Sequence, residues 1–575
     1  MLEPWLPELH SKLWKQEQLR PILFRTVDIT RAHYAELEKR LNEAHKTRNL
    51  ETYMATNVIS IKLDVLQNFI PAVADKVNSE VSDDGPDNLC PDELFEFLPA
   101  KIRYLDITPL ELQHLPRISF PMLIREQYDV MSTILYDQQV LEGISGSCLI
   151  TGQPGAGKTS YLYVLLIDRL LRGKDTIFQS INGRIYEISN TGVLELPLST
   201  LPTLSGNELL VLVDGDGNQA APMHEVHAPR ARIIVASSNK DKTSRRWMKQ
   251  IPGVPAMAYM INPFSSKEFL LTGIFLYVMD VTYARLNAAR KHLGNDPRCG
   301  FCASLSSSYF EEQVESITAN ITAVAASTDI GSLIYDIRIG GTSSQLFQIY
   351  TNDNRQSENC HIEQVSDWSF NRLLDKYEQW RTVNAGRDFF NVFRTQPRIT
   401  TFVWERQFFR FIQSPRTFVL RSLDDPSECT TCEWEFSGDA EHQTFESGSF
   451  PAGLQALIED KTSGHLKPLS SAGPVSDALA VYQPSRLIFL QFKRGNVESD
   501  DSRIVSGFER VQRWLKLECP HSSHLHPSES RPWMIISIVP EESAASFKQQ
   551  SFGRVWNLQV KQYVLGSPQK DLWEC

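Results

Sequence analysis

The sequence predicts an α/β protein made of several structural units. Three observations carry this prediction: the length, the composition, and short apolar runs that alternate with helix-forming segments. At 575 residues the chain is too long for one compact core. Its 42% hydrophobic and 22% charged residues are ordinary values for globular proteins. No stretch supplies the roughly 20 apolar residues of a membrane-spanning helix, so we expect no membrane partner.

The N-terminal sequence and the cysteines predict a cytoplasmic or nuclear protein. An early acid, Glu3, and two early prolines stand where a secretory signal has a basic end and an apolar run. Nine cysteines are an odd number and lie far apart, which does not favour a disulfide framework. The net charge of −11 excludes a generally basic surface, so any DNA site would be a local patch.

Residues 1–115 are predicted to form a helical N-terminal region. Ile29 to His45 has the apolar spacing of an amphipathic helix, with exposed charges four residues apart. The run from Asn78 to Asp92 is acidic and rich in turn-forming residues, and we interpret residues 78–92 as a flexible linker.

Residues 116–275 are predicted to form a parallel α/β core. Cys148 to Ile150 is a short apolar strand, and Tyr161 to Leu171 is an apolar helix that ends near Gly173. Two further apolar runs, Leu209 to Val213 and Arg232 to Ala236, are typical of strands buried on both faces of a sheet.

Residues 276–400 are predicted to form a helical lid, because Phe275 to Leu293 and Tyr309 to Ala326 have helical character. Residues 401–575 are predicted to form a second α/β domain. Its expected strands are Thr417–Leu420, Leu487–Phe492, Trp533–Val539 and Leu558–Val564, its expected helix is Phe508–Leu517, and the aromatic stretch from Arg406 is expected to be core and strand.

The segment between the first core strand and its helix predicts a phosphate-binding loop. Its residues are Gly152, Gln153, Pro154, Gly155, Ala156, Gly157, Lys158, Thr159 and Ser160, in which the first eight match G-x-x-x-x-G-K-[ST]. Glycines let the backbone amides and the helix N-terminus face an anion. Lys158 is expected to neutralise the phosphates and Thr159 to hold Mg²⁺. The site is therefore predicted to bind ATP or GTP with Mg²⁺.

Acidic residues after the next strand are candidates for the metal and for the attacking water. Asp214 follows an apolar run and is the expected carboxylate on the metal side. Hydrolysing P-loop proteins usually carry a glutamate beside this aspartate, and here Asp216 is the candidate substitute. The alternative is that both acids belong to a DGDG turn.

The third core strand and the segment after it supply weaker candidates. Asn239 closes Ser237-Ser238-Asn239, where a polar side chain could sense the γ-phosphate, although such residues also simply end strands. Arg245 and Arg246 could reach the transferred phosphoryl group as an arginine finger does, or form a solvated basic face.

The order of these motifs resembles the fungal NTPases of the Crinkler and retrotransposon-hot-spot type. The residues concerned are Pro121 to Tyr128 (PMLIREQY), ITGQPGAGKTS, VLVDGDG, IIVASSN with RRW, and INPFS. The resemblance covers about residues 115–350 and 470–565 and implies a P-loop NTPase, a helical lid and a C-terminal restriction-endonuclease-like domain. In the lid, Ile339 to Ser344 lacks the arginine of the family's Gly-Gly-x-Pro-Arg segment. The ubiquitin-like header of the effector members is not evident in residues 1–110.

Three C-terminal residues have the spacing of a metal-dependent nuclease site. Asp477 precedes the strand that carries Gln491 and Lys493, and this Gln-x-Lys variant looks like Mrr-type endonucleases. Asp477 and Gln491 would hold a metal ion, and Lys493 would stabilise the attacking hydroxide. Glu446 is a candidate for a further carboxylate.

The cysteine pairs Cys299/Cys302 and Cys429/Cys432 have zinc-knuckle spacing but lie far apart, and we do not expect a shared zinc site.

Two functions follow from these residues. The first is ATP binding and hydrolysis that control a nuclease-like, DNA-directed module. The alternative is a non-hydrolysing, nucleotide-dependent signalling switch with a degenerate nuclease domain. The sequence leaves the oligomeric state open, with a homo-oligomer as one alternative.

Overall fold

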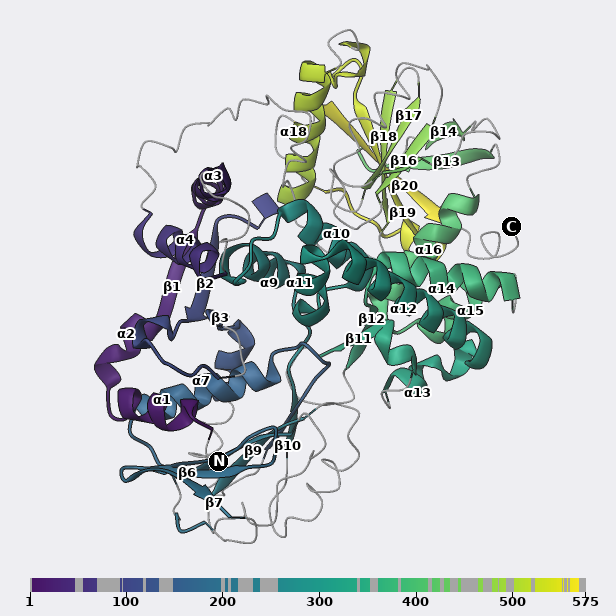
Figure 1. Cartoon of the computed structure of the whole chain (residues 1–575). Coiled ribbons are helices and arrows are strands. Elements are labelled where there is room, and N and C mark those ends of the chain that lie inside the picture. The colour runs from purple at the N-terminus through teal and green to yellow at the C-terminus, as the bar shows by residue number, and fades with distance from the viewer. Residues whose placement is uncertain are drawn as a thin grey trace. The chain divides into compact units, whose positions relative to one another are not determined.

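The computed structural model has a mixed α/β fold, as the sequence predicts. Its contacts divide the chain into two units, each described by itself (Figure 1). Unit 1 comprises Met1–Asn320 with Tyr335–Ser366, and unit 2 comprises Ile321–Ile334 with Asp367–Cys575. Residues 276–400, the expected lid, contribute to both units. The structure describes residues 3–46, 55–69, 94–95, 97–116, 120–133, 148–197, 202–204, 208–215, 231–237, 257–338, 342–351, 360–380, 384–411, 416–424, 429–434, 443–445, 464–468, 478–483, 486–492, 501–518, 523–550, 552, 556 and 559–567.

Unit 1 is built on a seven-stranded sheet with the order β10-β4-β9-β8-β5-β6-β7. Neighbouring strands from β10 to β5 are parallel, and β6 and β7 extend the sheet in antiparallel fashion. The strands are β4 (Cys148–Thr151), β5 (Thr176–Gln179), β6 (Ile185–Ser189), β7 (Gly192–Leu196), β8 (Leu210–Asp214), β9 (Arg232–Ala236) and β10 (Met257–Met260). Every residue of β4, β5, β8 and β9 is buried, which explains why most of their residues are apolar.

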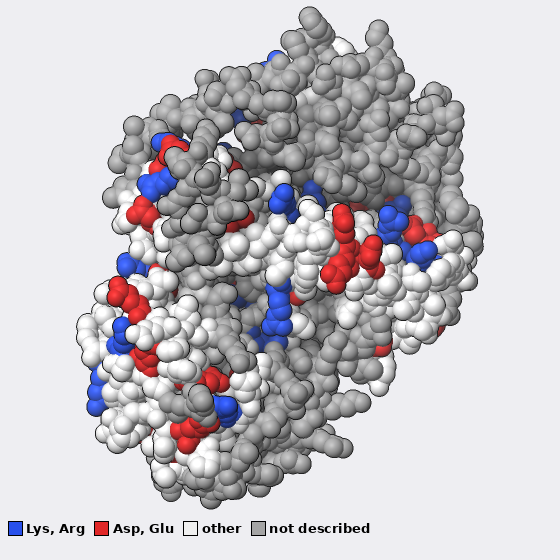
Figure 2. Space-filling model, in the orientation of Figure 1, with Lys and Arg blue, Asp and Glu red and all other residues white. Residues whose placement is uncertain are grey.

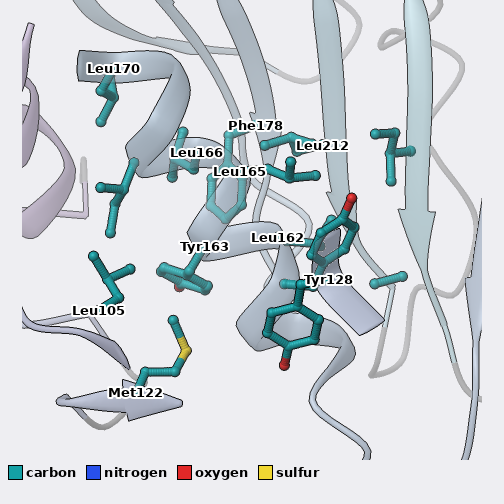
Figure 3. Packing of buried hydrophobic residues seen from close by; sticks show 14 of the residues in the cluster. Leu105, Met122, Tyr128, Leu162, Tyr163, Leu165, Leu166, Leu170, Phe178 and Leu212 are labelled. Atoms are coloured by element: carbon teal, nitrogen blue, oxygen red, sulfur yellow. The ribbon is translucent and has the colours of Figure 1, made fainter. Parts of the chain in front are cut away.

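Helix α7 (Lys158–Leu171) follows β4 and packs on one face of this sheet. Figure 3 shows leucines of α7 near Phe178 of β5 and Leu212 of β8, and Tyr163 of the same helix near Leu105 and Met122. Each fully buried side chain of this kind contributes about 1.5–3 kcal/mol. The start of α7 is therefore held firmly at the end of β4.

The N-terminal region contains strands as well as the expected helices. Its helices are α1 (Trp5–Leu13), α2 (Arg20–Leu23), α3 (Arg31–Lys46) and α4 (Ala55–Asn68). Strands β1 (Phe24–Ile29), β2 (Ala100–Leu105) and β3 (Met122–Leu123) form an antiparallel sheet. The expectation of a helical region was incomplete, because β1 finds its partner about 75 residues further along the chain, a pairing that local periodicity does not reveal. The predicted linker at 78–92 lies outside the described residues.

After β10 the chain of unit 1 is mainly helical. Its elements are α9 (Ser266–Leu271), a π-helical turn η6 (Thr272–Leu276), α10 (Tyr283–Leu293), α11 (Pro297–Leu305), and the hairpin β11 (Phe347–Tyr350) and β12 (His361–Gln364). Two further helices, α12 (Ser307–Ser327) and α13 (Leu333–Arg338), are each divided between the two units. The segment Phe275–Leu293, expected to be helical, is helical at both ends but not throughout, because the chain leaves the helical conformation at Tyr277. Thr282 then caps α10 by accepting a hydrogen bond from Arg285 N, so a new helix begins there.

Unit 2 contains an eight-stranded sheet with the order β14-β13-β20-β19-β18-β17-β16-β15. Strands β18, β19 and β20 are parallel to one another, and β17 is antiparallel to β18. The strands are β13 (Arg416–Ser422), β14 (Cys429–Trp434), β15 (Gln443–Phe445), β16 (Gly464–Pro468), β17 (Ala478–Gln483), β18 (Arg486–Phe492), β19 (Trp533–Pro540) and β20 (Val560–Ser567). The strands expected from residue 417 onward are thus present.

The helices of unit 2 cover both faces of its central strands. Phe508 of α18 packs with Phe489 and Trp533 on one face, and Phe408 of α16 packs with Phe492 on the other. The helices are α14 (Asp367–Trp380), α15 (Ala385–Val392), α16 (Pro397–Phe411), α18 (Asp501–Glu518) and α19 (Glu541–Ala544). The aromatic stretch from Arg406 is helical to Phe411, because it continues the helix that begins at Pro397, and from Arg416 it forms strand β13 as expected.

No single helix among the described residues is both long and apolar enough to cross a membrane. The bent pair Ser307–Ser327 and Ile330–Ile337 meets the length and composition limits only when its two helices are taken together.

On the face drawn in Figure 2, acidic and basic side chains of the described residues are interspersed.

Candidate phosphate-binding site

The loop from Gly152 to Gly157 turns the chain sharply between β4 and α7. Gly152, Gly155 and Gly157 have φ values of +149°, +78° and +91°, a region that side chains other than glycine rarely adopt. A Cβ atom at Gly152 would lie 2.5 Å from the Ile261 carbonyl oxygen, and one at Gly157 would lie 2.4 Å from the Tyr128 hydroxyl. The glycines are therefore required both for the turn and for the close approach of neighbouring atoms.

The first turn of α7 begins directly after this loop. Gly157 is the residue before the helix, and no side chain caps the helix there. The first N–H groups of a helix have no partner within it, and the helix dipole makes this end attractive to anions. A glycine turn followed by an uncapped helix start is an arrangement whose backbone amides can bind an anion.

Lys158 lies within the loop and is only 3% exposed. Its Nζ donates hydrogen bonds to the carbonyl oxygens of Gly152 and Gln153, at 3.2 Å and 3.1 Å. The ammonium group therefore folds back over the loop, close to the place where an anion would sit. A phosphate would offer it a stronger, charge-assisted partner than these carbonyls.

Thr159 and Asp214 come from different elements and meet at the carboxyl edge of the sheet. Asp214 is the last residue of β8, which is separated from β4 by β9. The Thr159 hydroxyl donates to Asp214 Oδ1 at 3.1 Å. Two adjacent ligands of an octahedral ion with metal–oxygen bonds of 2.0–2.1 Å are roughly 2.9 Å apart. This pair of oxygens therefore has the spacing and the chemistry to hold Mg²⁺.

Several expected site residues fall outside the described part of the chain. They are Asp216, Asn239, Arg245 and Arg246, together with Asp477, Lys493 and Glu446 in the C-terminal domain. Gly341 and the two residues before it, in the lid segment without the family arginine, are also outside it. Gly215 and Ser237, which flank these gaps, are held in the sheet by backbone hydrogen bonds to Ala236 and Ile150.

Arg125 is a buried support of the loop that the spacing of residues did not single out. Two of its N–H groups bind the Glu268 carboxylate at 2.8 Å. The other three donate to the carbonyl oxygens of Ala156, Asn262 and Pro263, at 2.7, 2.8 and 2.9 Å. All five guanidinium donors are thus used, and the guanidinium ties the phosphate loop to the start of α9.

Tyr128 supports the end of the loop from the same segment. Its hydroxyl donates to the Gly157 carbonyl oxygen at 2.8 Å, and its ring packs on Tyr161 of α7. Complete burial raises the pKa of Tyr128 to about 12. The tyrosine therefore stays protonated and keeps its donor role.

Residues beyond position 340 also contact the loop region. Gln153 Nε2 donates to the Phe347 carbonyl oxygen at 2.7 Å. Asn262 exchanges two hydrogen bonds with the backbone of Thr351, at 2.9 Å and 3.0 Å. The β11–β12 hairpin thus lies beside the phosphate loop, which a sequence pattern cannot indicate.

In unit 2, Gln491 is the one expected nuclease residue within the described chain. It is 2% exposed, and no described atom bonds its Oε1. It pairs with Ala478 on one side and with Ser537 on the other, so residue 478, next to Asp477, lies beside it. The two cysteine pairs lie on α11 in unit 1 and on β14 in unit 2. Among the described residues, no three His, Cys, Asp or Glu side chains converge as a metal site would require.

No family model matches the sequence, and no curated protein is similar to it.

Proposed function

We propose that Gly152 to Ser160 binds the phosphates of a nucleoside triphosphate, ATP or GTP, together with Mg²⁺. The observation that carries the proposal is the glycine turn that leads into the buried start of α7, with Lys158 folded over it and Thr159 3.1 Å from Asp214. Backbone amides would bind the phosphate oxygens, and Lys158 would neutralise their charge. Thr159 and Asp214 would hold the ion, which draws electron density from the phosphates when bound.

The order of motifs supports a second part of the proposal, namely that the chain is a Crinkler or retrotransposon-hot-spot type NTPase. The segment of Arg125 and Tyr128 precedes the loop, and that of Asn262 follows the last core strand. Arg125 and Tyr128 donate to the loop carbonyl oxygens of Ala156 and Gly157, and the Asn262 amide donates to Gln127 of the first segment. Their place in the family pattern therefore has a physical reason.

A titration calorimetry experiment with the full chain tests nucleotide binding. Lys158→Ala removes the loop cation, and we expect the affinity for MgATP or MgGTP to fall by about tenfold or more, because charge-assisted hydrogen bonds contribute about 1.5–3 kcal/mol. Lys174→Ala is the matched control, since Lys174 lies on the surface in an ion pair with Glu208. Equal affinity of wild type and Lys158→Ala would remove the proposal.

A measurement of nucleotide hydrolysis distinguishes the two proposed functions, the hydrolysing NTPase and the non-hydrolysing signalling switch. Turnover of ATP that increases with DNA supports a switch or motor that controls a DNA-directed module. Tight binding without turnover supports a signalling switch in which the nucleotide stabilises one arrangement of the lid. In the described chain Gly215, not a glutamate, follows Asp214, which favours the second alternative.

For the C-terminal domain we propose a metal-dependent nuclease site around Gln491. No described atom donates a hydrogen bond to the buried Gln491 Oε1, and burying an amide oxygen without a partner costs free energy. A metal ion bound to this oxygen would remove that cost. Gln491 and Asp477 would hold the ion that activates water, and Lys493 would stabilise negative charge.

Incubation of plasmid DNA with Mg²⁺ or Mn²⁺ tests this second proposal. We expect the wild type to cleave the DNA and the Asp477→Ala/Lys493→Ala double variant to be inactive. Lys561→Ala, at an exposed lysine of β20, serves as the control. Equal cleavage by wild type and double variant, or none by either, would contradict the proposal.

A further inference from the structure

The carboxylate of Asp296 lies directly against the phosphate loop. A Cβ atom at Gly155 would be 2.0 Å from Asp296 Oδ1 and 2.7 Å from its Cγ. No other residue type could therefore stand at Gly155 while Asp296 keeps this position. An acid is thus in contact with the middle of a loop whose geometry suits anions.

The backbone around Asp296 is fixed by packing. Asp296 is the N-cap of α11 and accepts a hydrogen bond from Arg298 N at 2.9 Å. Gly294 ends α10 at φ +79°, and a Cβ atom there would lie 2.5 Å from Val365 Cγ1. On the next turn, a Cβ atom at Gly300 would lie 2.5 Å from Phe269 Cζ. The helix start therefore holds the carboxylate at the loop.

The surroundings do not fully compensate the charge of this carboxylate. Burial is the largest influence and raises the pKa of Asp296, while hydrogen bonds from Arg298 and Cys299 act in the opposite direction. Lys158, the cation of the loop, instead bonds the carbonyl oxygens of Gly152 and Gln153. A phosphate entering the loop would therefore meet a negative charge at Gly155.

We propose that Asp296 is an electrostatic gate of the phosphate loop: its carboxylate at Gly155 opposes the binding of phosphates, which displace it together with the first turn of α11 when they bind. The inference rests on the proposed nucleotide binding and adds its regulation. Because α11 packs with α9 and α10, the displacement transmits the state of the loop to the helices after the core. A change at α11 that shifts Asp296 would in turn alter nucleotide affinity, since such coupling is reciprocal.

Calorimetric titration of the full chain with MgATP tests the gate. Asp296→Asn removes the charge but keeps the size and the N-cap. We expect its dissociation constant for MgATP to be about three- to tenfold lower than that of wild type at low salt, because a neighbouring like charge disfavours an anion. The difference should shrink at high salt. Asp329→Asn removes an N-cap aspartate of unit 2 and serves as the matched control, with wild-type affinity expected.

A second measurement on the wild type does not depend on the variant's folding. Amide hydrogen exchange of residues 294–302 should become faster when MgATP is added, because the N-cap carboxylate leaves its position. The gate would be overturned if hydrogen exchange of residues 294–302 did not change, or if Asp296→Asn bound MgATP as tightly as wild type. Neither result would affect the proposal that Lys158 binds the nucleotide. Weaker binding by Asp296→Asn would overturn it too and make Asp296 a nucleotide contact. Absence of binding by wild type and Asp296→Asn alike would remove the proposed function itself.

Discussion

At the scale of single residues, Arg125 shows how the loop geometry is maintained. The side chain is 2% exposed, yet it bears a charge, which is expensive unless the charge is paired and hydrogen-bonded. Glu268 supplies the opposite charge, and three carbonyl oxygens complete the remaining donors. Glu268 is also part of the capping box of α9 with Ser265. One guanidinium thus joins the phosphate loop, the segment after β10 and a helix start.

The Arg125→Lys variant should destabilise the protein although it keeps the charge. A lysine offers three donors in place of five and cannot bind the carboxylate in a bidentate way. The variant leaves buried acceptors without their hydrogen bonds, and each of these costs about 1–3 kcal/mol. We expect a clearly lower melting temperature by circular dichroism. Arg103→Lys, in an ion pair at the surface with Asp129, is the control and should change little. A melting temperature equal to wild type for both variants would show that Arg125 is not a support.

At the scale of elements, Lys62 of α4 supports the end of the π-helical turn η6. Its Nζ donates to the carbonyl oxygens of Gly273, Tyr277 and Met279, at 3.3, 2.9 and 2.9 Å. Gly273 lies in the π-helical turn, and Tyr277 and Met279 lie in the segment that follows it. The buried amine therefore binds carbonyl oxygens on both sides of the point where the helix ends. Burial lowers the pKa of Lys62 to about 7, against a weaker opposing influence of Asp280.

This lowered pKa gives the stability a defined pH dependence. An unfolded lysine titrates near pH 10.4, so between pH 7 and that value the unfolded chain holds more protons than the folded one. The free energy of unfolding therefore rises with pH in this window. From pH 7 to 8.5 the stability advantage of wild type over Lys62→Met should grow by about 1–2 kcal/mol, read from thermal melts at both pH values. Lys174→Met is the control. An advantage that stays constant or falls would contradict the lowered pKa.

At the scale of the whole molecule, local sequence patterns predicted the buried strands well and the long-range contacts poorly. Strands β8 and β9 and helix α7 lie within one to three residues of their expected bounds, because apolar runs and helical spacing are local signals. The Thr159–Asp214 contact was also predictable, since the carboxyl ends of parallel strands meet at one edge. The β1–β2 pairing and the break at Tyr277 were not, because both depend on residues far along the chain.

The residues that contact the candidate site from other segments also depend on long-range contacts, so local sequence patterns did not predict them. Arg125 lies in the segment Pro121 to Tyr128, but the sequence of that segment does not show that its guanidinium binds the Ala156 carbonyl oxygen. The sequence analysis did not single out Asp296, and only the fold places it at Gly155. Local motifs therefore indicate the candidate site residues more readily than the residues that contact them in the fold.

The most direct measurement is a crystal structure of the full chain with Mg²⁺ and a non-hydrolysable ATP analogue. The expected result has phosphate oxygens bound by the backbone amides between Gly155 and Thr159, Lys158 turned from the loop carbonyls to the phosphates, and Mg²⁺ beside Thr159 and Asp214. A structure in which the analogue binds elsewhere, while Lys158 remains on Gly152 and Gln153, would contradict the central claim.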